Sequence, residues 1–89
     1  MQASKSKKNE EICKLLGEVV QELKGKKKKS ILAYESDLPR SVVYYILDGK
    51  KDPQLTTLWR LALGLDMRPS QLLKIMEDRL ESGWDSFLD

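Results

Sequence analysis

Residues 40–45 bring together side chains that could recognise a nucleic acid. The guanidinium of Arg40 could pair with O6 and N7 of guanine, which is worth about 1–3 kcal/mol of discrimination between bases. Ser41 could bond to a base or to a phosphate, and Tyr44 and Tyr45 offer hydroxyls to phosphates and ring faces to thymine methyl groups. Adjacent tyrosines are also common as partly buried helix residues, and Tyr45 is the better candidate for contact.

Two lysine runs flank this segment, at residues 26–29 and at Lys50 and Lys51. Four consecutive lysines repel one another, so a solvated loop is the plain interpretation. Here, however, the first run leads directly into a predicted helix, where cations oppose the helix dipole unless an anion is bound. We therefore predict that Lys28 and Lys29 contact phosphates and add affinity that falls with salt.

These side chains are positioned by two short predicted helices, at residues 29–36 and 40–47. Asp37 tolerates the left-handed conformation that a tight turn between them requires, and Pro39 suits the start of the second helix. Gly49 ends that helix, although residues 42–46 have high strand propensity on their own. The second helix should bury one face and expose Arg40, Ser41, Tyr44 and Tyr45 on the other; the buried residues are Val43, Ile46 and Leu47.

Apolar residues at helical spacing predict three further helices, at 10–24, over about 55–65, and from an N-cap at Ser70. Gly17, inside the first stripe, indicates close approach of another helix, and Cys13 beside it should be a small packing residue. Trp59 lies off the centre of its stripe and could be at a core edge or on a partner surface. The stripes comprise Ile12, Leu15, Leu16, Val19, Val20 and Leu23; Leu55, Leu58, Leu61, Ala62 and Leu65; and Leu72, Leu73, Met76 and Leu80.

The chain is short enough for one domain, which we place at residues 10–81. Residues 1–9 are polar and lysine-rich and are expected to form a flexible basic tail with an N-cap at Asn9. Residues 82–89 contain Trp84, Phe87 and Leu88 and form an apolar C-terminal tail that should fold back or pack on another copy of the chain. The region 72–88 is thus the predicted dimer contact.

Composition excludes several classes of protein. The 89 residues contain no histidine and one cysteine, so a zinc site and an internal disulfide are not expected. No apolar run approaches the roughly 20 residues that span a bilayer, and no secretory signal follows the first lysines, which favours a cytoplasmic protein. There is no glycine-rich phosphate loop or acidic pair in a cleft-forming context, so we expect no enzyme activity, no cofactor and no small-molecule ligand.

Charge is distributed unevenly within a net charge of +2. Residues 1–53 carry 12 Lys/Arg against 8 Asp/Glu, whereas residues 66–89 carry 3 against 6. A basic half and an acidic half fit a protein that turns one end toward nucleic acid. Small soluble domains often show such fluctuations, so this signal favours nucleic acid only slightly.

The order of residues resembles the Cro/C1-type, or XRE, helix-turn-helix family over residues 10–75. The match is carried by Leu32-Ala33, Leu38, Arg40-Ser41, Val43, Ile46, Gly49 and Pro53, and then by Leu55, Leu58, Leu61-Ala62, Leu65, Ser70 and Leu72-Leu73. The resemblance implies an all-α, five-helix lambda-repressor-like DNA-binding domain that usually forms homodimers. It also implies a phosphate contact at Lys29, base-facing positions at Arg40, Ser41, Tyr44 and Tyr45, and contact of Lys50 and Lys51 with the opposite strand. The chain departs from the family pattern at Asp37, Pro39 and Leu47, where glycine, serine or threonine, and an acidic residue are usual.

Two functions follow as hypotheses. The first is a sequence-specific, double-stranded DNA-binding transcriptional regulator whose helix 40–47 enters the major groove. The alternative is a protein-interaction module, an antitoxin or adaptor on the same fold with weak DNA binding, which Asp37, Asp48 and Asp52 near the proposed DNA face would favour. Salt-dependent binding to a pool of genomic DNA distinguishes them.

Overall fold

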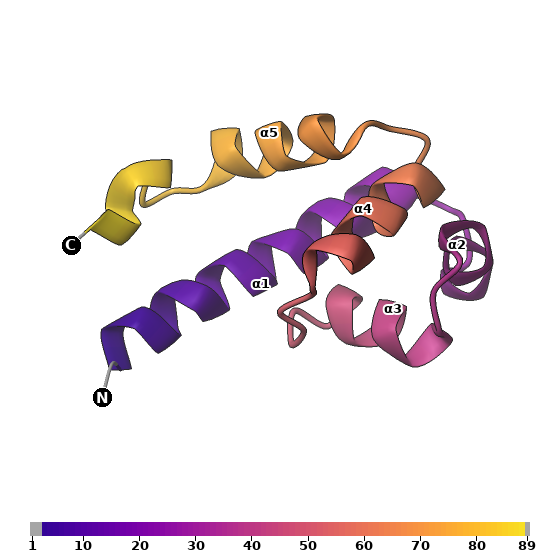
Figure 1. The fold of residues 1–89 in the computed structure, drawn as a ribbon, viewed down its shortest axis with the longest axis horizontal. Coiled ribbons are helices and arrows are strands. Elements are labelled where there is room, and N and C mark those ends of the chain that lie inside the picture. Colours follow the sequence, from indigo (N-terminus) through magenta and orange to yellow (C-terminus); the bar gives the residue numbers. More distant parts are fainter. Residues whose placement is uncertain (1–2, 89) are drawn as a thin grey trace.

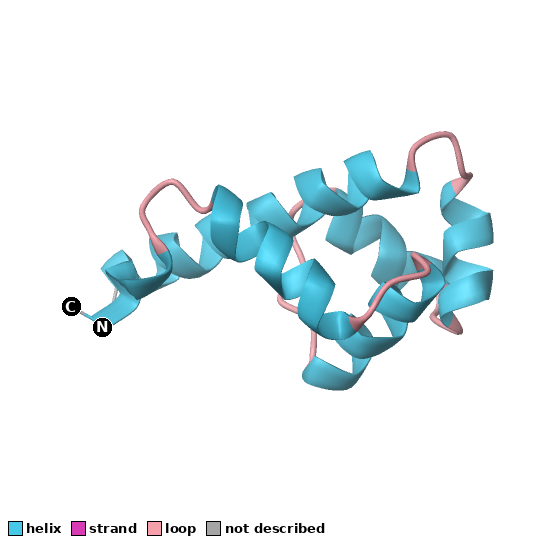
Figure 2. Ribbon diagram, turned by 90° about the horizontal axis from the view of Figure 1, so that it is seen from above, coloured by secondary structure: helices cyan, strands magenta, loops and turns pink. Residues whose placement is uncertain are grey.

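The computed structural model describes the backbone of residues 3–88 and the side chains of residues 7–86. Within this range all regular secondary structure is helical and no strand is present, which confirms the all-α prediction with five α-helices. A short 3₁₀-helix, η1, follows them (Figures 1 and 2). The helices are α1 (Ala3–Lys24), α2 (Lys29–Ser36), α3 (Arg40–Leu47), α4 (Leu55–Gly64) and α5 (Pro69–Arg79), followed by η1 (Trp84–Leu88).

Helices α2 and α3 have the predicted bounds, and the turn between them explains why. Asp37 adopts a left-handed conformation with φ 56° and ψ 46°, which reverses the chain direction after α2. The N–H of Leu38 then donates to the carbonyl of Ala33 at 3.0 Å. Pro39 has an extended ψ of 145° and precedes the first helical residue of α3. At the other end of α3, Gly49 takes a φ of 73° and ends the helix.

The core lies where all five α-helices meet. Helix α2 packs on α3 and α4, while α1 packs on α3 and α5, and α4 packs on α5. Leu38, Leu47 and Leu58 are half-buried at the edge of this core rather than inside it. The fully or nearly fully buried residues are Leu16, Val19, Val20, Leu32, Ala33, Val43, Ile46, Leu61, Ala62, Leu72 and Met76.

Gly17 lies at the closest approach of α1 and α3. A Cβ placed on Gly17 would come within 2.7 Å of the carbonyl oxygen of Ile46, which is too short for any side chain without a shift of the backbone. This confirms the predicted close approach of a second helix at this residue. Cys13, one turn earlier, is buried as predicted.

The predicted start of the first helix is wrong. Helix α1 begins at Ala3, so residues 3–9 are helical rather than a flexible tail, and Asn9 is not an N-cap. Residues 3–9 contain neither proline nor glycine, and alanine and lysine are good helix formers, so nothing in this sequence ends the helix before Glu10. Residues 1 and 2 of the predicted tail lie outside the described residues.

Helix α5 starts one residue before the predicted N-cap. Pro69 is its first residue, and Arg68 precedes it in an extended conformation, so Ser70 is already helical. Proline suits this position because its φ is preset and its missing N–H would have no helical partner. The side-chain oxygen of Gln71 accepts a hydrogen bond from the N–H of Arg68 at 2.8 Å, which satisfies one donor at this helix end.

The C-terminal segment folds back beside the first half of α1, as Figures 1 and 2 both show. Lys8 Nζ donates to the carbonyl oxygen of Ser86 at 2.6 Å, and the hydroxyl of Ser82 lies 3.1 Å from a carboxylate oxygen of Glu11. Trp84 nevertheless stays 66% exposed. The side chains of Phe87 and Leu88 and the whole of Asp89 lie outside the described residues, so their part of the predicted dimer contact stays a prediction.

Several residues of the predicted apolar stripes lie on the surface. Leu55 is 67% exposed, Leu73 is 46% exposed and Leu23 is 37% exposed. Each belongs to a helix whose buried face is narrower than its apolar stripe, because only one or two neighbouring helices cover it. Within residues 3–88, no helix is both long and apolar enough to cross a membrane.

Candidate nucleic-acid interface

The outer face of α3 carries the four predicted recognition residues. Arg40, Ser41, Tyr44 and Tyr45 are all exposed, with Tyr44 at 40% and Tyr45 at 56%. Residues three and four apart share a helix face, so Arg40, Ser41, Tyr44 and Tyr45 form one continuous surface opposite the buried residues of α3. The structure therefore brings these four side chains together, as the sequence predicts.

Lys29 joins this surface from the neighbouring helix. Its ammonium nitrogen lies 5.5 Å from the centre of the Tyr44 ring, within the distance at which a cation is attracted to an aromatic face. Lys29 is the first residue of α2, and Tyr44 lies in the middle of α3. The contact thus places a predicted phosphate ligand beside a predicted recognition residue, a pairing that sequence spacing alone does not indicate.

The start of α2 is open to an incoming anion. Lys28 precedes the helix in an extended conformation with φ −68° and ψ 147°, and no side chain caps this end. Its carbonyl accepts the N–H groups of Ile31 and Leu32 at 3.0 Å, which leaves the N–H groups of Lys29 and Ser30 without intrahelical partners. Uncapped N–H groups next to two exposed lysines favour a bound phosphate oxygen.

Lys27 differs from the two lysines that follow it. Its ammonium pairs with the carboxylate of Glu35 and also lies 3.3 Å from the carbonyl oxygen of Gly64. The hydrogen bond to Glu35 raises the pKa of Lys27 above its usual value. Lys27 therefore ties the start of α2 to its own last turn and to the end of α4, and the surface for an anion is formed by Lys28 and Lys29.

An ion pair joins α4 to the turn between α2 and α3. Arg60 Nη1 on α4 lies 2.7 Å from Oδ2 of Asp37, and both side chains are largely exposed. Asp37 places a negative charge near the proposed interface, and Arg60 balances it there. Sequence inspection missed this role of Arg60, because a single arginine 23 residues from Asp37 carries no local signal.

Lys50 and Lys51 follow the end of α3, where the backbone N–H of Lys50 donates to the carbonyl oxygen of Tyr45 at 3.0 Å. Lys50 is exposed and lines a surface hollow of about 580 Å³ together with Asp48, Asp52 and residues of α1, while Lys51 is half-buried. Among the described side chains, no hydrogen bond or ion pair joins Lys50 or Lys51 to the four residues of α3. Their contact with a second phosphate strand stays a prediction.

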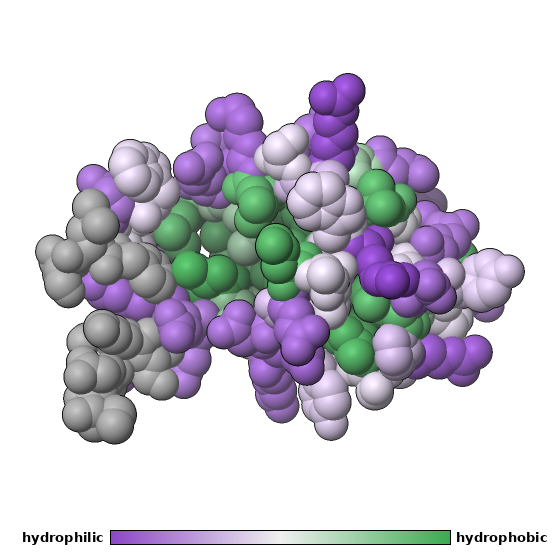
Figure 3. Space-filling view, viewed as in Figure 1, coloured by the Kyte–Doolittle hydropathy of each residue, from purple (hydrophilic) through white to green (hydrophobic). Residues whose placement is uncertain are grey.

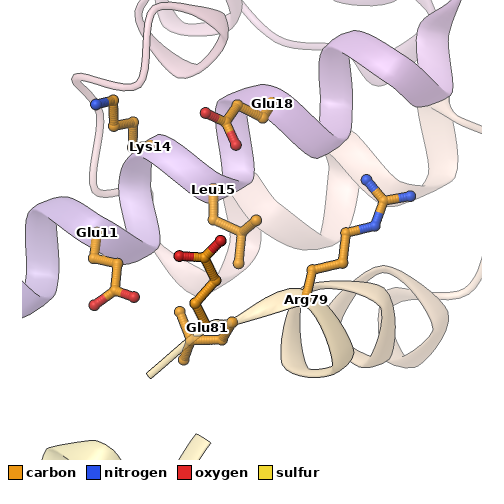
Figure 4. A pocket seen from close by; sticks show the side chains of 7 residues that line it. Glu11, Lys14, Leu15, Glu18, Arg79 and Glu81 are labelled. Atoms are coloured by element: carbon orange, nitrogen blue, oxygen red, sulfur yellow. The ribbon is translucent and has the colours of Figure 1, made fainter. Parts of the chain in front are cut away.

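A second hollow, between α1 and the end of α5, is lined by mixed charges. Figure 4 shows Glu11 and Glu18 on the same side of α1, with Glu81 and Arg79 facing them from the α5 side. Arg79 is engaged in an ion pair with Glu22 at 2.7 Å. Across residues 7–86, no group of three histidine, cysteine or acidic side chains is arranged to hold a metal ion.

Comparison of the chain with protein-family models, with curated proteins and with solved structures gives no match.

Proposed function

We propose that this protein binds double-stranded DNA in a sequence-specific manner, with α3 in the major groove, and acts as a transcriptional regulator. The observation that carries the proposal is the joint surface of α2 and α3. An exposed face of Arg40, Ser41, Tyr44 and Tyr45 adjoins an uncapped helix start flanked by Lys28 and Lys29. A helix is the element that fits the major groove, and the end of a neighbouring helix commonly meets the DNA backbone.

Each side chain of this surface has a defined role in the proposal. Arg40 opens α3 and reads a guanine through two parallel hydrogen bonds, while Ser41 contacts an adjacent base or phosphate. Lys28 and Lys29 bind phosphates and fix the register of α3 without reading sequence. Tyr44, held beneath the Lys29 ammonium, directs its hydroxyl toward the same phosphate, and Tyr45 contacts a thymine methyl group through its ring. Lys50 and Lys51 add a weaker contact with the opposite strand.

A binding titration with a pool of random genomic duplexes tests the proposal. We expect the logarithm of the association constant to fall linearly with the logarithm of salt concentration, because lysines displace counterions from phosphates. Replacing Lys28 and Lys29 together by alanine should flatten this slope by about two, since each lost phosphate contact removes about one. Arg40→Ala should weaken binding to a preferred site more than binding to the pool.

Lys7→Ala is the matched control for these substitutions. Lys7 is an exposed lysine on α1, outside the α2–α3 surface and outside residues 72–88, so its loss should leave the salt slope unchanged. Absence of binding at low salt, or binding unaffected when Lys28, Lys29 and Arg40 are all replaced, would remove DNA from the proposal.

A protein-interaction module is the second candidate function. It is favoured by exposed apolar side chains on α4 and α5, including Trp59 and Leu73, which lie on helices separate from the α3 surface. A chain that binds no duplex in the titration but keeps this apolar surface would belong to this second class.

A further inference from the structure

The guanidinium of Arg40, on which the proposed guanine contact depends, is unpaired within the protein. Among the described side chains it forms no ion pair and no hydrogen bond. Arg40 is also the first residue of α3, whose first turn contains no acidic residue and whose N-cap, Pro39, offers no side-chain hydrogen bond. A cation at the start of a helix opposes the helix dipole, so a carboxylate within reach would attract Arg40.

Asp37 is the carboxylate that Arg40 can reach. The two residues are three positions apart, so their Cα atoms are separated by at most about 11 Å even if the chain between them is fully extended. The Asp37 side chain is 89% exposed, which leaves its carboxylate free to turn in water. The long arginine side chain spans the remaining distance, and a pair between them would occupy the donors that Arg40 presents to a base.

Cations from outside α3 hold the acidic residues that precede Arg40. The ammonium of Lys27, in the loop before α2, pairs with Glu35 in the last turn of α2. Arg60 Nη1, on α4, lies 2.7 Å from Asp37 Oδ2. Both carboxylates are therefore engaged from the side of the molecule away from the start of α3, and Arg40 remains unpaired.

The packing of α4 on α2 places Arg60 at this position. A Cβ built on Gly64, one turn after Arg60, would come within 3.0 Å of the Cα of Ser36, which directly precedes Asp37. The end of α2 and the last turn of α4 are thus fixed against each other beside the ion pair. Figure 3, viewed as in Figure 1, shows strongly hydrophilic side chains at the surface between α4 and the α2–α3 turn.

We propose that Arg60 is a positioning residue for base recognition, because it holds the Asp37 carboxylate away from Arg40. The inference rests on the proposed DNA-binding function and names a residue outside its contact surface. Without the Arg60 cation, Asp37 pairs with Arg40 and competes with guanine for the two guanidinium donors. Glycine, which is usual at the position of Asp37 in the family that the sequence resembles, would create no such competition.

Two other roles of Arg60 predict different behaviour. If Arg60 bound a phosphate itself, its loss would weaken binding to every duplex and lower the salt slope by about one. If Arg60 only supported the fold, the loss would persist whatever the charge of Asp37. Capture of Arg40 by Asp37 predicts a loss of affinity for the preferred duplex that disappears when Asp37 is uncharged.

A suppression experiment with Asp37→Asn tests the proposal. Asparagine also tolerates the left-handed conformation but carries no charge. Arg60→Ala should lower the affinity for a duplex selected by the wild-type chain by about two- to fivefold, the range of an exposed ion pair, and leave binding to random duplexes unchanged. The Arg60→Ala/Asp37→Asn chain should bind the selected duplex as tightly as Asp37→Asn alone. Arg60→Lys, which keeps a cation opposite Asp37, should bind as the wild type does.

Arg68→Ala is the matched control. Arg68 is an exposed arginine before α5 that forms no ion pair among the described side chains, so its loss releases no carboxylate. Its ratio of selected to random binding should equal that of the wild type. An Arg60→Ala defect that Asp37→Asn does not relieve, or that equals the effect of Arg68→Ala, would overturn the proposal.

A measurement without DNA separates this proposal from the proposed function. The ¹H–¹⁵N resonance of the Arg40 Nε–H group, identified by its absence in Arg40→Lys, should move in Arg60→Ala and return in the Arg60→Ala/Asp37→Asn chain. An Arg40 resonance that does not respond to Arg60→Ala would overturn the capture of Arg40, whether or not the chain binds DNA. A wild-type chain that binds no duplex, although this resonance moves and returns, would overturn the proposed function instead.

Discussion

The hydroxyl of Ser36 occupies the space that a side chain at Gly64 would need. A Cβ built on Gly64 would come within 1.9 Å of Ser36 Oγ and 2.9 Å of Ser36 Cβ. Both residues are buried, Ser36 at the end of α2 and Gly64 at the end of α4. The last turns of the two helices therefore touch without an intervening side chain, which fixes α2, and with it the start of the α2–α3 turn, against α4.

Replacing Gly64 by alanine should destabilise the fold by about 2–3 kcal/mol, because extra volume in a packed core forces backbone shifts. In an uncrowded helix the same change would stabilise by about 1 kcal/mol. Urea denaturation of Gly64→Ala measures the difference. Gly25→Ala serves as the control, since no atom lies within 4 Å of its Cβ and only its φ of 55° opposes the change. A Gly64→Ala protein as stable as the wild type would contradict the close contact.

Asp37 should contribute to stability mainly through its backbone conformation. Asp37→Ala is expected to cost about 1–2 kcal/mol, because alanine disfavours the left-handed region and the ion pair with Arg60 is also lost. Arg60→Ala removes the ion pair alone and should cost less than about 1 kcal/mol, since both partners are exposed to solvent. Thermal unfolding of both variants checks this order. An Arg60→Ala effect larger than that of Asp37→Ala would show that the charge dominates.

The contact between Lys29 and Tyr44 should appear as a coupling energy between α2 and α3. A double-mutant cycle of Lys29→Met and Tyr44→Leu, measured by chemical denaturation, should give about 0.5–1 kcal/mol for a cation over an exposed ring. The methionine keeps the stem of the lysine and removes its charge. The same cycle with Lys28→Met provides the control and should give no coupling. Equal values in the two cycles would contradict a specific Lys29–Tyr44 contact.

Cys13 should make the fold less stable at alkaline pH. Its pKa is raised above 9.0, first by burial and then by the carboxylates of Asp52 and Glu10. The folded state thus holds the thiol proton more tightly than the unfolded state. The contribution of the protonated thiol to the free energy of unfolding is therefore complete below pH 9.0, and it is lost as pH rises through the pKa that the thiol has in the folded state. The fall in melting temperature between about pH 8 and about pH 10 should be smaller for Cys13→Ala than for the wild type. An equal fall in both proteins would contradict this role.

The sequence predicts α2 and α3 to the residue because each boundary has its own local cause. Pro39 and Gly49 mark the start and the end of α3, and Asp37 ends α2 in a left-handed turn. The exposure of the four α3 residues follows from helical period once Val43 and Ile46 are assigned to the core. Signals of this kind act within a few residues of the chain, so they are visible without a structure.

Contacts between distant residues were not predictable in the same way. The pairs Ser36–Gly64, Asp37–Arg60 and Lys29–Tyr44 depend on how the helices pack, and no spacing in the sequence encodes them. The exposure of Leu55 and Leu73 was not predictable either. Both residues fit an apolar stripe at helical spacing, but they lie beyond the neighbouring helices that cover the centre of that stripe. The start of α1 was missed because Asn9 and the two glutamates after it resemble a helix start within a helix that begins earlier.

Selection of bound sequences from a random duplex library tests the central claim most directly. The proposed contacts of α3 predict enrichment of a short consensus that contains a guanine read by Arg40, and Arg40→Ala should lose preference at that base pair alone. If the chain binds as a dimer, the consensus should be palindromic, with half-sites that are one helical turn of DNA apart. A wild-type chain that enriches no sequence over the starting library would contradict sequence-specific DNA binding.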